Sequence, residues 1–226
     1  MRFVTLIGNP KAESRTATVA LAATRAVIAA AGVEAKHQTI DLSALACRLL
    51  VPQASAVIED AVEQVLAADV LLVASPTYKG TYTGLLKVFL DRFGYRALIS
   101  TVALPVLVMK HPEHALAVEV HLRPLLVELG ATVPTPGLAV LETDLGRLDH
   151  VLLPWARRVG ETFTGAGRPG TGRPGTGRAG AGRAVSGPAA LAAVVTPAAA
   201  TTPAAVVTPA AVVTPAAATA STGIPA

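Results

Sequence analysis

The 226-residue sequence contains a single cysteine, Cys47, so no disulfide can form within the chain. Without a cysteine pair, nothing indicates an oxidising compartment. No stretch approaches the roughly 20 consecutive apolar residues that a membrane helix needs, and the apolar run at residues 3–7 is too short for a secretory signal. These absences predict a cytoplasmic protein without a membrane partner.

Acidic residues and lysine are missing after about residue 164. The only charged side chains beyond that point are Arg168, Arg173, Arg178 and Arg183, and without them the chain has 15 basic and 15 acidic residues. The first part of the chain is therefore formally neutral, and the pI of 9.6 comes from the last part. A basic protein would suggest nucleic acid or an anionic membrane as a partner. The neutral part gives no reason to expect either.

Residues 165–226 have a repetitive composition that cannot form a hydrophobic core. Gly-Arg-Pro-Gly-Thr recurs up to Arg183, and Val-Val-Thr-Pro-Ala-Ala recurs to the end. The segment has no aromatic residues and little Leu or Ile, and proline every few residues prevents a continuous helix. We expect one domain over residues 1–164 and a disordered, dispensable tail over residues 165–226. The alternative is that the arginines tether the chain to a partner.

Strand-like and helix-like patterns alternate five times before the tail. Strands are expected at 3–7, 33–40, 70–74, 102–109 and 138–141, and helices at 15–31, 57–66, 83–93, 113–129 and 148–163. Residues 41–55 are expected to form a long connection, and Pro124 to kink the fourth helix. Pro105 is unusual for an inner strand.

This alternation predicts an α/β fold with a parallel sheet, helices on both faces and right-handed crossovers. The run Val70–Ala74 is apolar throughout, as expected for a central strand covered on both sides. For five strands we expect the flavodoxin-like order 2-1-3-4-5, which places ligands beyond the carboxyl ends of the first and third strands.

The loop after the first strand, residues 8–16, leads directly into a helix. The unpaired N–H groups and partial positive charge at a helix start suit a phosphate. Ser14 and Thr16 add hydroxyl donors, and Lys11 and Arg15 can supply charge. The loop has neither the G-x-G-x-x-G nor the Walker pattern. Either it binds a phosphate, or Ser14 is only a helix N-cap beside solvated basic residues.

The loop after the third strand reads Ser-Pro-Thr-Tyr-Lys-Gly-Thr-Tyr-Thr-Gly over residues 75–84. Proline and glycine constrain its backbone, the threonine hydroxyl and exposed amides can bond the polar edge of a heterocycle, and Tyr78 offers a flat face. A flavin needs this combination, with one side left open for hydride transfer. The alternative is a strand-to-helix turn with a packed tyrosine. The expected meeting of both loops at one crevice favours the flavin.

Both loops resemble the NADPH-dependent FMN reductase family. The resemblance rests on Gly8-Asn9-Pro10-Lys11 with Ser14-Arg15-Thr16, and on Ala74–Lys79 with Tyr82–Lys87 and Leu90-Asp91. It covers residues 1 to about 160, and the second motif is the more specific. The nearest branch supplies reduced flavin to two-component monooxygenases such as the alkanesulfonate system.

The resemblance implies a role for each motif. The FMN phosphate would be held by Asn9, Lys11, Ser14, Arg15 and Thr16, and the isoalloxazine would be lined by Pro76, Thr77, Tyr78 and Lys79. The helix from Thr83 would pack in a homodimer or homotetramer, completing the site across the interface.

One stretch departs from the family pattern. After the fourth strand the family has a Gly-Gly turn that approaches the flavin, whereas this chain has the bulkier His111-Pro112-Glu113. His111 stands in that turn and joins the candidate flavin-binding residues. His111 and His114 lack a third ligand at metal-site spacing, so no metal is expected. Cys47 has no nearby base and is not a candidate nucleophile.

The activity that these features predict is NAD(P)H-dependent reduction of FMN, with hydride passing from nicotinamide C4 to flavin N5. Such a transfer requires no acid–base catalytic residue. The reduced flavin would be supplied to a partner monooxygenase. The alternatives are a quinone, azo or metal-ion reductase that retains FMN, a flavodoxin-type electron carrier, a redox-inactive flavin-binding regulator, or a dimeric scaffold without flavin. A carrier should be acidic, which the neutral domain disfavours.

Overall fold

The computed structural model describes residues 1–51 and 55–165, with side chains up to Phe163. Apart from Gly165, the expected tail at residues 165–226 lies outside the described residues. The elements in chain order are β1 (Arg2–Ile7), α1 (Arg15–Ala31), β2 (Lys36–Asp41), η1 (Leu42–Ala44), α2 (Ala46–Leu49), α3 (Ala56–Leu66), β3 (Val70–Pro76), α4 (Gly84–Leu90), β4 (Val102–Met109), η2 (Pro112–His114), the π-helix η3 (Val118–Leu122), α5 (Arg123–Glu128), β5 (Leu138–Leu141), η4 (Glu142–Arg147) and α6 (Leu148–Gly165). None of the described helices is long and apolar enough to cross a membrane.

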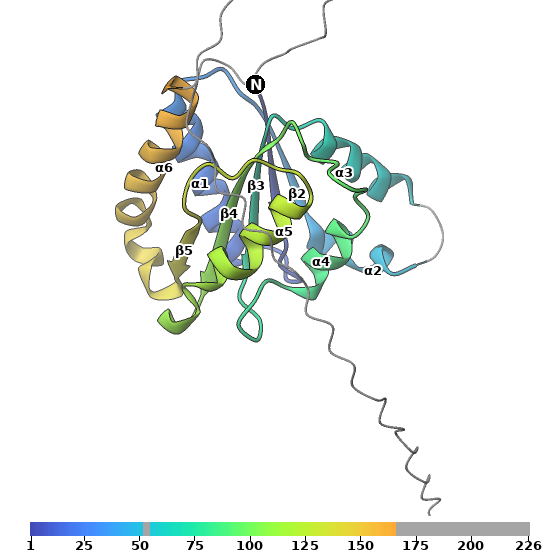
Figure 1. Cartoon of the computed structure of the whole chain (residues 1–226). Helices are drawn as coiled ribbons and strands as arrows, with labels where there is room; N and C mark the ends of the chain where they lie inside the picture. Colours follow the sequence, from blue (N-terminus) through green and yellow to red (C-terminus); the bar gives the residue numbers. More distant parts are fainter. Residues whose placement is uncertain (52–54, 166–226) are drawn as a thin grey trace, which may run out of the picture. The chain divides into compact units, whose positions relative to one another are not determined.

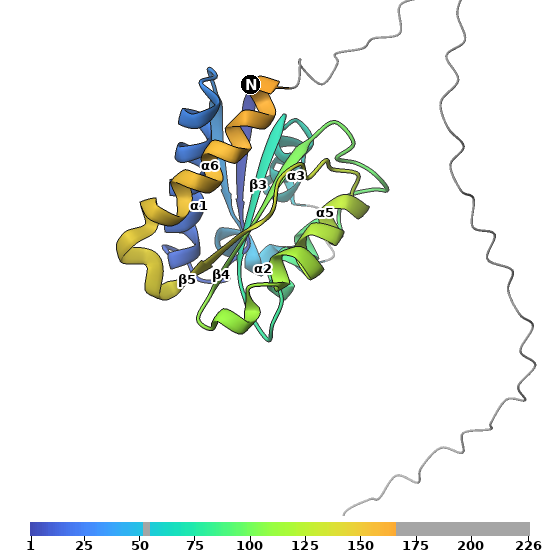
Figure 2. The same cartoon turned by 60° about the vertical axis from the view of Figure 1, so that its left-hand side comes forward.

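The strands form one parallel sheet in the order β2-β1-β3-β4-β5, which confirms the predicted flavodoxin-like topology. The strand order reverses between β1 and β3, so the loops that follow these two strands lie beside each other at one edge of the sheet. Figure 1 shows the sheet between two helical layers, with α1 and α6 on one face and α3, α4 and α5 on the other. Figure 2 shows α1 and α6 packed side by side.

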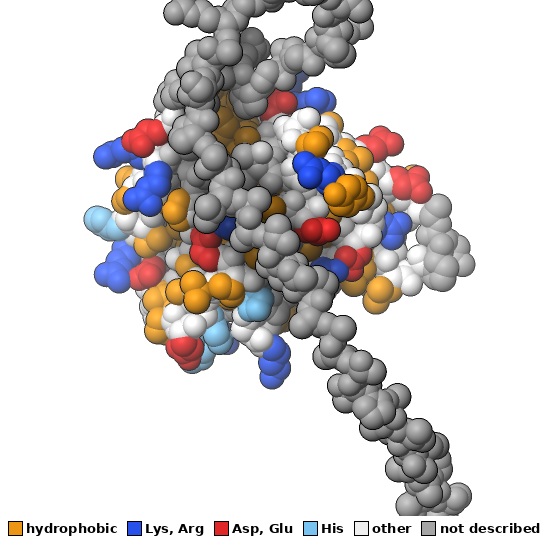
Figure 3. All heavy atoms as spheres, in the orientation of Figure 1, with side chains coloured by type: hydrophobic (Ala, Val, Ile, Leu, Met, Phe, Trp, Pro, Cys, Tyr) orange, Lys and Arg blue, Asp and Glu red, His pale blue; other side chains and the backbone are white. Residues whose placement is uncertain are grey.

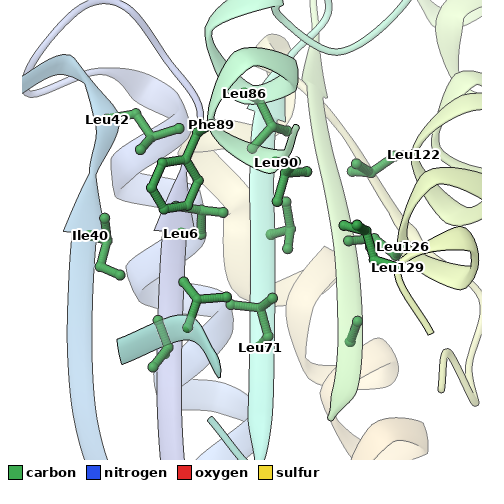
Figure 4. Packing of buried hydrophobic residues seen from close by; sticks show 14 of the residues in the cluster. Leu6, Ile40, Leu42, Leu71, Leu86, Phe89, Leu90, Leu122, Leu126 and Leu129 are labelled. Carbon is green, nitrogen blue, oxygen red and sulfur yellow. The ribbon is translucent and has the colours of Figure 1, made fainter. Parts of the chain in front are cut away.

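Side chains alternate between two apolar cores along each strand, as the period of two dictates. In β1, Val4 and Leu6 join the core under α2–α5, while Phe3 and Ile7 join the core under α1 and α6. Figure 4 shows part of the first core, with Leu6, Leu71, Leu86 and Phe89 among the labelled residues. Because both faces of the sheet are covered, β3 is apolar from Val70 to Ala74 and β4 is apolar along its whole length.

The first helix begins and ends where its sequence predicts. Ser14 lies in an extended conformation and its side chain accepts a hydrogen bond from the N–H of Ala17 at 3.2 Å, so it caps the helix. Gly32 closes the helix with φ +61°, the left-handed conformation that glycine adopts without steric penalty.

Pro105 fits an inner strand because its nitrogen faces a place without a partner strand. Along a parallel strand, N–H groups alternate between the two neighbours, and Ala103 on the same side donates toward Thr132. Pairing of β4 with β5 begins only at Val106, opposite Leu138. No ladder hydrogen bond is therefore lost at Pro105.

Four expectations about the elements are wrong in part. The helix expected over 83–93 spans only Gly84–Leu90. The second strand starts at Lys36 rather than Val33, because β1 offers its first pairing residue, Arg2, only there. Residues 41–55 contain the short helices η1 and α2 within the expected loop; Leu42, Leu45 and Leu49 of this stretch are buried.

The expected helix over 113–129 is also interrupted. It divides into η2, the π-helix η3 and α5, and Pro124 is the second residue of α5. Proline has no N–H to bond four residues back, and the preceding N–H, of Arg123, bonds to the carbonyl of Val118, five residues back. The predicted kink thus takes the form of a π-helical turn before the proline.

Candidate functional site

The loops after β1 and β3 are joined at their bases by buried hydrogen bonds. The N–H of Gly8 donates to the carbonyl of Ala74 at 2.7 Å, and the Thr83 hydroxyl donates to the carbonyl of Gly8 at 2.6 Å. Gly8 is also required by space, because a Cβ there would lie 2.7 Å from Cβ of Leu86. The structure therefore brings both predicted binding loops to one edge of the sheet.

Three of the predicted phosphate ligands form a compact polar group at the start of α1. Asn9, Ser14 and Thr16 are all more than nine-tenths buried. The Asn9 side-chain Nδ2 donates to the Thr16 hydroxyl at 3.1 Å, and the Asn9 side-chain Oδ1 accepts from the N–H of Lys11 at 2.9 Å. Asn9 thus fixes the shape of the loop from inside.

The two basic candidates of this loop, Lys11 and Arg15, are exposed. Arg15 forms an ion pair with Glu142, the first residue of η4 after β5. The loop also contains Glu13 in the left-handed conformation at φ +50°, which a non-glycine residue seldom adopts.

The loop after β3 is a short β-hairpin. Tyr78 and Thr81 pair through two backbone hydrogen bonds, of 2.8 and 3.3 Å. Lys79 and Gly80 between them both have positive φ, +54° and +79°, as a type I′ turn requires. The hairpin therefore has a defined shape before any ligand binds.

The hairpin's own bonds decide which of its backbone amides can meet a ligand. The N–H of Thr77 donates to the carbonyl of Val108 at 2.9 Å, and the N–H of Tyr78 donates to Thr81. The N–H groups of Thr77 and Tyr78 are thus not available as the exposed amides that the loop was expected to offer. The N–H groups of Lys79 and Gly80 have no acceptor within the described part of the chain. Tyr78 is 49% exposed and is not packed into the core as the alternative interpretation expected.

His111 lies beyond β4, three residues after the Val108 carbonyl that anchors Thr77. Its side chain is exposed, with Nδ1 4.0 Å from a carboxylate oxygen of Glu113 and its ring 6.1 Å from that of His114. In Figure 3, which has the orientation of Figure 1, some of the pale-blue histidine side chains lie toward the lower end of the molecule, and another lies at its left edge. His111 thus follows β4 at the carboxyl edge of the sheet, and no hydrogen bond of the described residues joins it to the hairpin.

Two ion pairs shift pKa values on the elements that follow these loops. A hydrogen bond to Asp91 raises the pKa of Lys87 on α4. On η3, the hydrogen bond from Arg123 lowers the pKa of Glu119, and the N–H of Gly137 adds to this effect. Among the described residues, no group of three or more His, Cys, Asp or Glu side chains gathers that could hold a metal ion.

Comparison with known proteins assigns the chain to a family. The family described as NADPH-dependent FMN reductase matches residues 1–145. The chain belongs to the NADPH-dependent FMN reductase family.

Members and neighbours of this family are similar over most of the described residues. The chain is 36% identical to an FMN reductase (NADPH) of Escherichia coli (strain K12) over 131 residues, 58% of this chain and 68% of that protein. It is 32% identical to an FMN reductase (NADPH) of Pseudomonas aeruginosa over 164 residues, 70% of this chain and 86% of that protein. A solved structure described as the apo form of an NADH:FMN oxidoreductase (EMOB) superposes with a TM-score of 0.64 at 29% identity, over 72% of this chain and 87% of that chain.

Membership of the NADPH-dependent FMN reductase family confirms the predicted enzyme class, an NAD(P)H-dependent oxidoreductase acting on FMN, and with it the predicted FMN and NAD(P)H. The donors at the start of α1 fit the phosphate of FMN. The N–H groups of Arg15 and Thr16 have no acceptor among the described residues. The Thr16 hydroxyl accepts from Asn9 and keeps its own hydrogen for a ligand.

The sequence predicted no binding or positioning role for the side chains of Ser75, Thr83 or Glu142 in this FMN reductase. Thr83 is the N-cap of α4 and accepts from the N–H of Leu86, a local role that a threonine before a helix can indicate. Its bonds to Ser75 and Gly8 join residues 8 and 75 positions apart, and no local signal reveals them. Glu142 directly follows β5. The rule that ligands gather at carboxyl ends of strands could have drawn attention to it.

Proposed function

We propose that the chain binds FMN between the two loops, with the phosphate at the start of α1 and the isoalloxazine against the hairpin. Asn9, Lys11, Ser14, Arg15 and Thr16 hold the phosphate in this assignment. Pro76, Thr77, Tyr78, Lys79 and His111 lie around the ring. The observation that carries the proposal is the direct bond between the loops, from Thr83 to Gly8.

The phosphate assignment follows from the donors that remain. A helix start presents unpaired N–H groups with a partial positive charge, and two such groups, of Arg15 and Thr16, lack a protein acceptor in the described residues. The hydroxyls of Ser14 and Thr16 are held in place because each accepts a hydrogen bond from a neighbour, Ala17 or Asn9. They can therefore bond to an anion with little rearrangement. Arg15 and Lys11 add positive charge from the exposed side.

The ring assignment follows from the preformed hairpin. The N–H groups of Lys79 and Gly80 are the donors that the hairpin leaves for the polar edge of a heterocycle. Tyr78 offers an aromatic surface that is half exposed. When bound, FMN supplies N5 as the acceptor of the hydride from nicotinamide C4. The chain's part is to hold the ring with one face open, and no protein acid or base is required.

The finer functional assignments are proposals as well. We propose a homodimer or homotetramer built through the α4 region, supported by the exposed apolar side chains of Tyr95 and Ile99, which are 83% and 60% exposed. We also propose that the reduced FMN passes to a partner monooxygenase in the cytoplasm. Residues 1–164 form the catalytic domain in this proposal, and residues 165–226 are not required for activity.

The test is a steady-state titration of purified full-length protein. NADPH and NADH oxidation are followed with FMN as the varied substrate, and with riboflavin, which lacks the phosphate, as the matched flavin. Saturable FMN-dependent oxidation with a lower KM for FMN than for riboflavin is expected. Equal KM values would contradict the phosphate assignment, and no FMN-dependent oxidation would contradict the activity.

A quinone control separates the main alternative. If the protein purified with FMN and reduced a quinone faster than added FMN, it would be a reductase that retains its flavin. We expect the opposite, with little bound flavin after purification and turnover that depends on added FMN.

A further inference from the structure

Thr83 makes three hydrogen bonds that together involve both loops. Its N–H donates to Oγ of Ser75 at 3.0 Å, its hydroxyl donates to the Gly8 carbonyl at 2.6 Å, and the same hydroxyl accepts from the N–H of Leu86 at 3.1 Å. A carbonyl can only accept, so the direction of the bond to Gly8 is fixed. The hydroxyl's single hydrogen is therefore used in the bond to Gly8 of the other loop.

These bonds lie where water cannot replace them. Thr83 is 2% exposed and Ser75 is fully buried. A hydrogen bond lost in such a place leaves its partner unsatisfied. The bond from Thr83 therefore determines where the Gly8 carbonyl can lie.

Gly8 is the first residue of the loop over residues 8–16, here called the phosphate loop, and residues of β3 and α4 hold it from several sides. Its N–H donates to Ala74 and its carbonyl accepts from Thr83. Leu86 in the first turn of α4 lies so close that a side chain at Gly8 would collide with it. The start of the phosphate loop is thus positioned by the residues that flank the hairpin.

We propose that Thr83 is a positioning residue that fixes the separation between the phosphate loop and the hairpin, so that one FMN molecule can contact both. The inference rests on the proposed function, in which residues 9–16 hold the phosphate and residues 76–80 the ring. Two contacts to one ligand reinforce each other only when their separation matches the ligand without adjustment. Thr83 then contributes to the preference for FMN over riboflavin without touching either.

The experiment compares Thr83→Val with Thr83→Ser. Valine has nearly the same shape as threonine but cannot donate to Gly8 or cap α4, whereas serine retains both functions. KM for FMN and for riboflavin is measured with NADPH for each protein. The ratio of the KM for riboflavin to the KM for FMN falls about fivefold toward unity in Thr83→Val, the equivalent of one hydrogen bond. The ratio returns to the wild-type value in Thr83→Ser.

Ser75→Ala is the matched control for general loosening. It removes a buried hydroxyl bonded to Thr83 and to the carbonyl of Pro76 but leaves the bond from Thr83 to Gly8. We expect it to lower the thermal midpoint while keeping the riboflavin-to-FMN ratio of KM values of the wild type. If Thr83→Val does not fold, Thr83→Cys, whose thiol is a weak donor, gives the same test with a smaller fall.

The outcomes separate the inference from the function on which it rests. A wild-type ratio in Thr83→Val overturns the positioning role while the phosphate assignment stands. An equal fall in Ser75→Ala also overturns it, because the loss would then follow from loosening alone. A wild-type enzyme that does not distinguish FMN from riboflavin overturns both.

Discussion

At the scale of single residues, Arg15 has two roles that compete. In the proposed function it supplies positive charge to the FMN phosphate, yet in the structure it is paired with Glu142, from a segment 127 residues further along the chain. The Arg15 side chain is 61% exposed and that of Glu142 is 25% exposed. Exposed ion pairs contribute about 0–1 kcal/mol. The pair can therefore open when a phosphate binds, but the cost of breaking it weakens the binding of the phosphate.

Glu142→Gln is therefore expected to tighten FMN binding. Removal of the competing carboxylate frees Arg15 and lessens the repulsion of the phosphate, which lowers the Kd for FMN about two- to fivefold at low salt. Riboflavin binding should not change. Flavin fluorescence quenching measures both.

Asp144→Asn is the matched control for Glu142→Gln, because it makes the same change of charge in η4 but removes a pair with Arg147 instead. It should leave FMN affinity near the wild-type value. Weaker FMN binding in Glu142→Gln would show that the carboxylate holds Arg15 in place for the phosphate rather than competing with it.

Gly8→Ala tests the close approach between the phosphate loop and α4. The added Cβ would meet Leu86 at 2.7 Å, so backbone or helix must shift, and overpacking of this kind costs about 1–3 kcal/mol. The urea midpoint should fall accordingly. Gly84→Ala is the control, because its Cβ would have no neighbour within 4 Å and a helix start accepts alanine. Equal midpoints for the two variants would refute the close approach.

At the scale of elements, the segment from η3 to β5 is held by one charged pair. Arg123 bonds to Glu119 and also donates to the carbonyls of Val133 and Thr135, at 2.8 and 2.6 Å. The Glu119 carboxylate in turn accepts from the N–H of Gly137. The pair thus positions the connection that leads into β5, so its loss should loosen that edge of the sheet.

Glu119→Gln is expected to lower stability at neutral pH and not at acid pH. The pKa of Glu119 is lowered in the folded protein, chiefly by Arg123. A lowered pKa stabilises the fold above the ordinary glutamate value of about 4.3 and loses this effect as the pH falls through the folded-state value. The pair is partly exposed, so we expect about 1 kcal/mol, or 2–4 °C in thermal midpoint, at pH 7.

Thermal midpoints measured between pH 3 and pH 7 check this dependence. The difference between wild type and Glu119→Gln should shrink as the pH falls below about 4. Glu128→Gln, an exposed change on α5, serves as the control and should alter the midpoint little at any pH. A pH-independent difference would assign the effect of Glu119 to packing instead of charge.

The elements differ in how far the sequence predicts them. Apolar runs and end signals, such as Ser14 and Gly32 around α1, act locally and predict their elements correctly. The π-helix before Pro124 arises from one missing N–H within a longer apolar pattern, which periodicity does not register. Likewise α2 has only four residues, too few to show a period.

The contacts of the candidate site also divide into local ones, which the sequence can predict, and distant ones, which it cannot. The Ser14 cap and the Asn9 turn are local and could be inferred from the order of residues. The bond between Thr83 and Gly8 joins residues 75 positions apart, and its existence depends on the strand order. The sequence pattern predicted that order, but not which side chains would meet across it.

At the scale of the whole molecule, charge is divided unequally along the chain. The described residues hold all the acidic side chains, and the four arginines after residue 164 account for the formal net charge of +4. Charge of one sign in a repetitive segment favours weak, salt-dependent association with anions. The NADPH-dependent FMN reductase match covers residues 1–145 and thus lies before that segment.

A truncation after Gly165 separates the contributions of the two parts. α6 ends at Gly165, and its buried residues Leu152, Trp155 and Val159 all lie before the cut. Because α6 and the core it covers are retained, kcat and KM for FMN and NADPH should stay within about twofold of the full chain. The thermal midpoint should also be preserved.

The informative control is a full-length chain in which the four arginines are replaced by glutamine. If the truncation lowered activity and this variant did too, the arginines would take part in catalysis or assembly, contrary to the proposal. If the truncation alone lowered activity, the remaining repeats would contribute through length or composition. Retention of full activity by both variants confines the enzyme to the sheet and its two helical layers, where the phosphate loop and the hairpin meet.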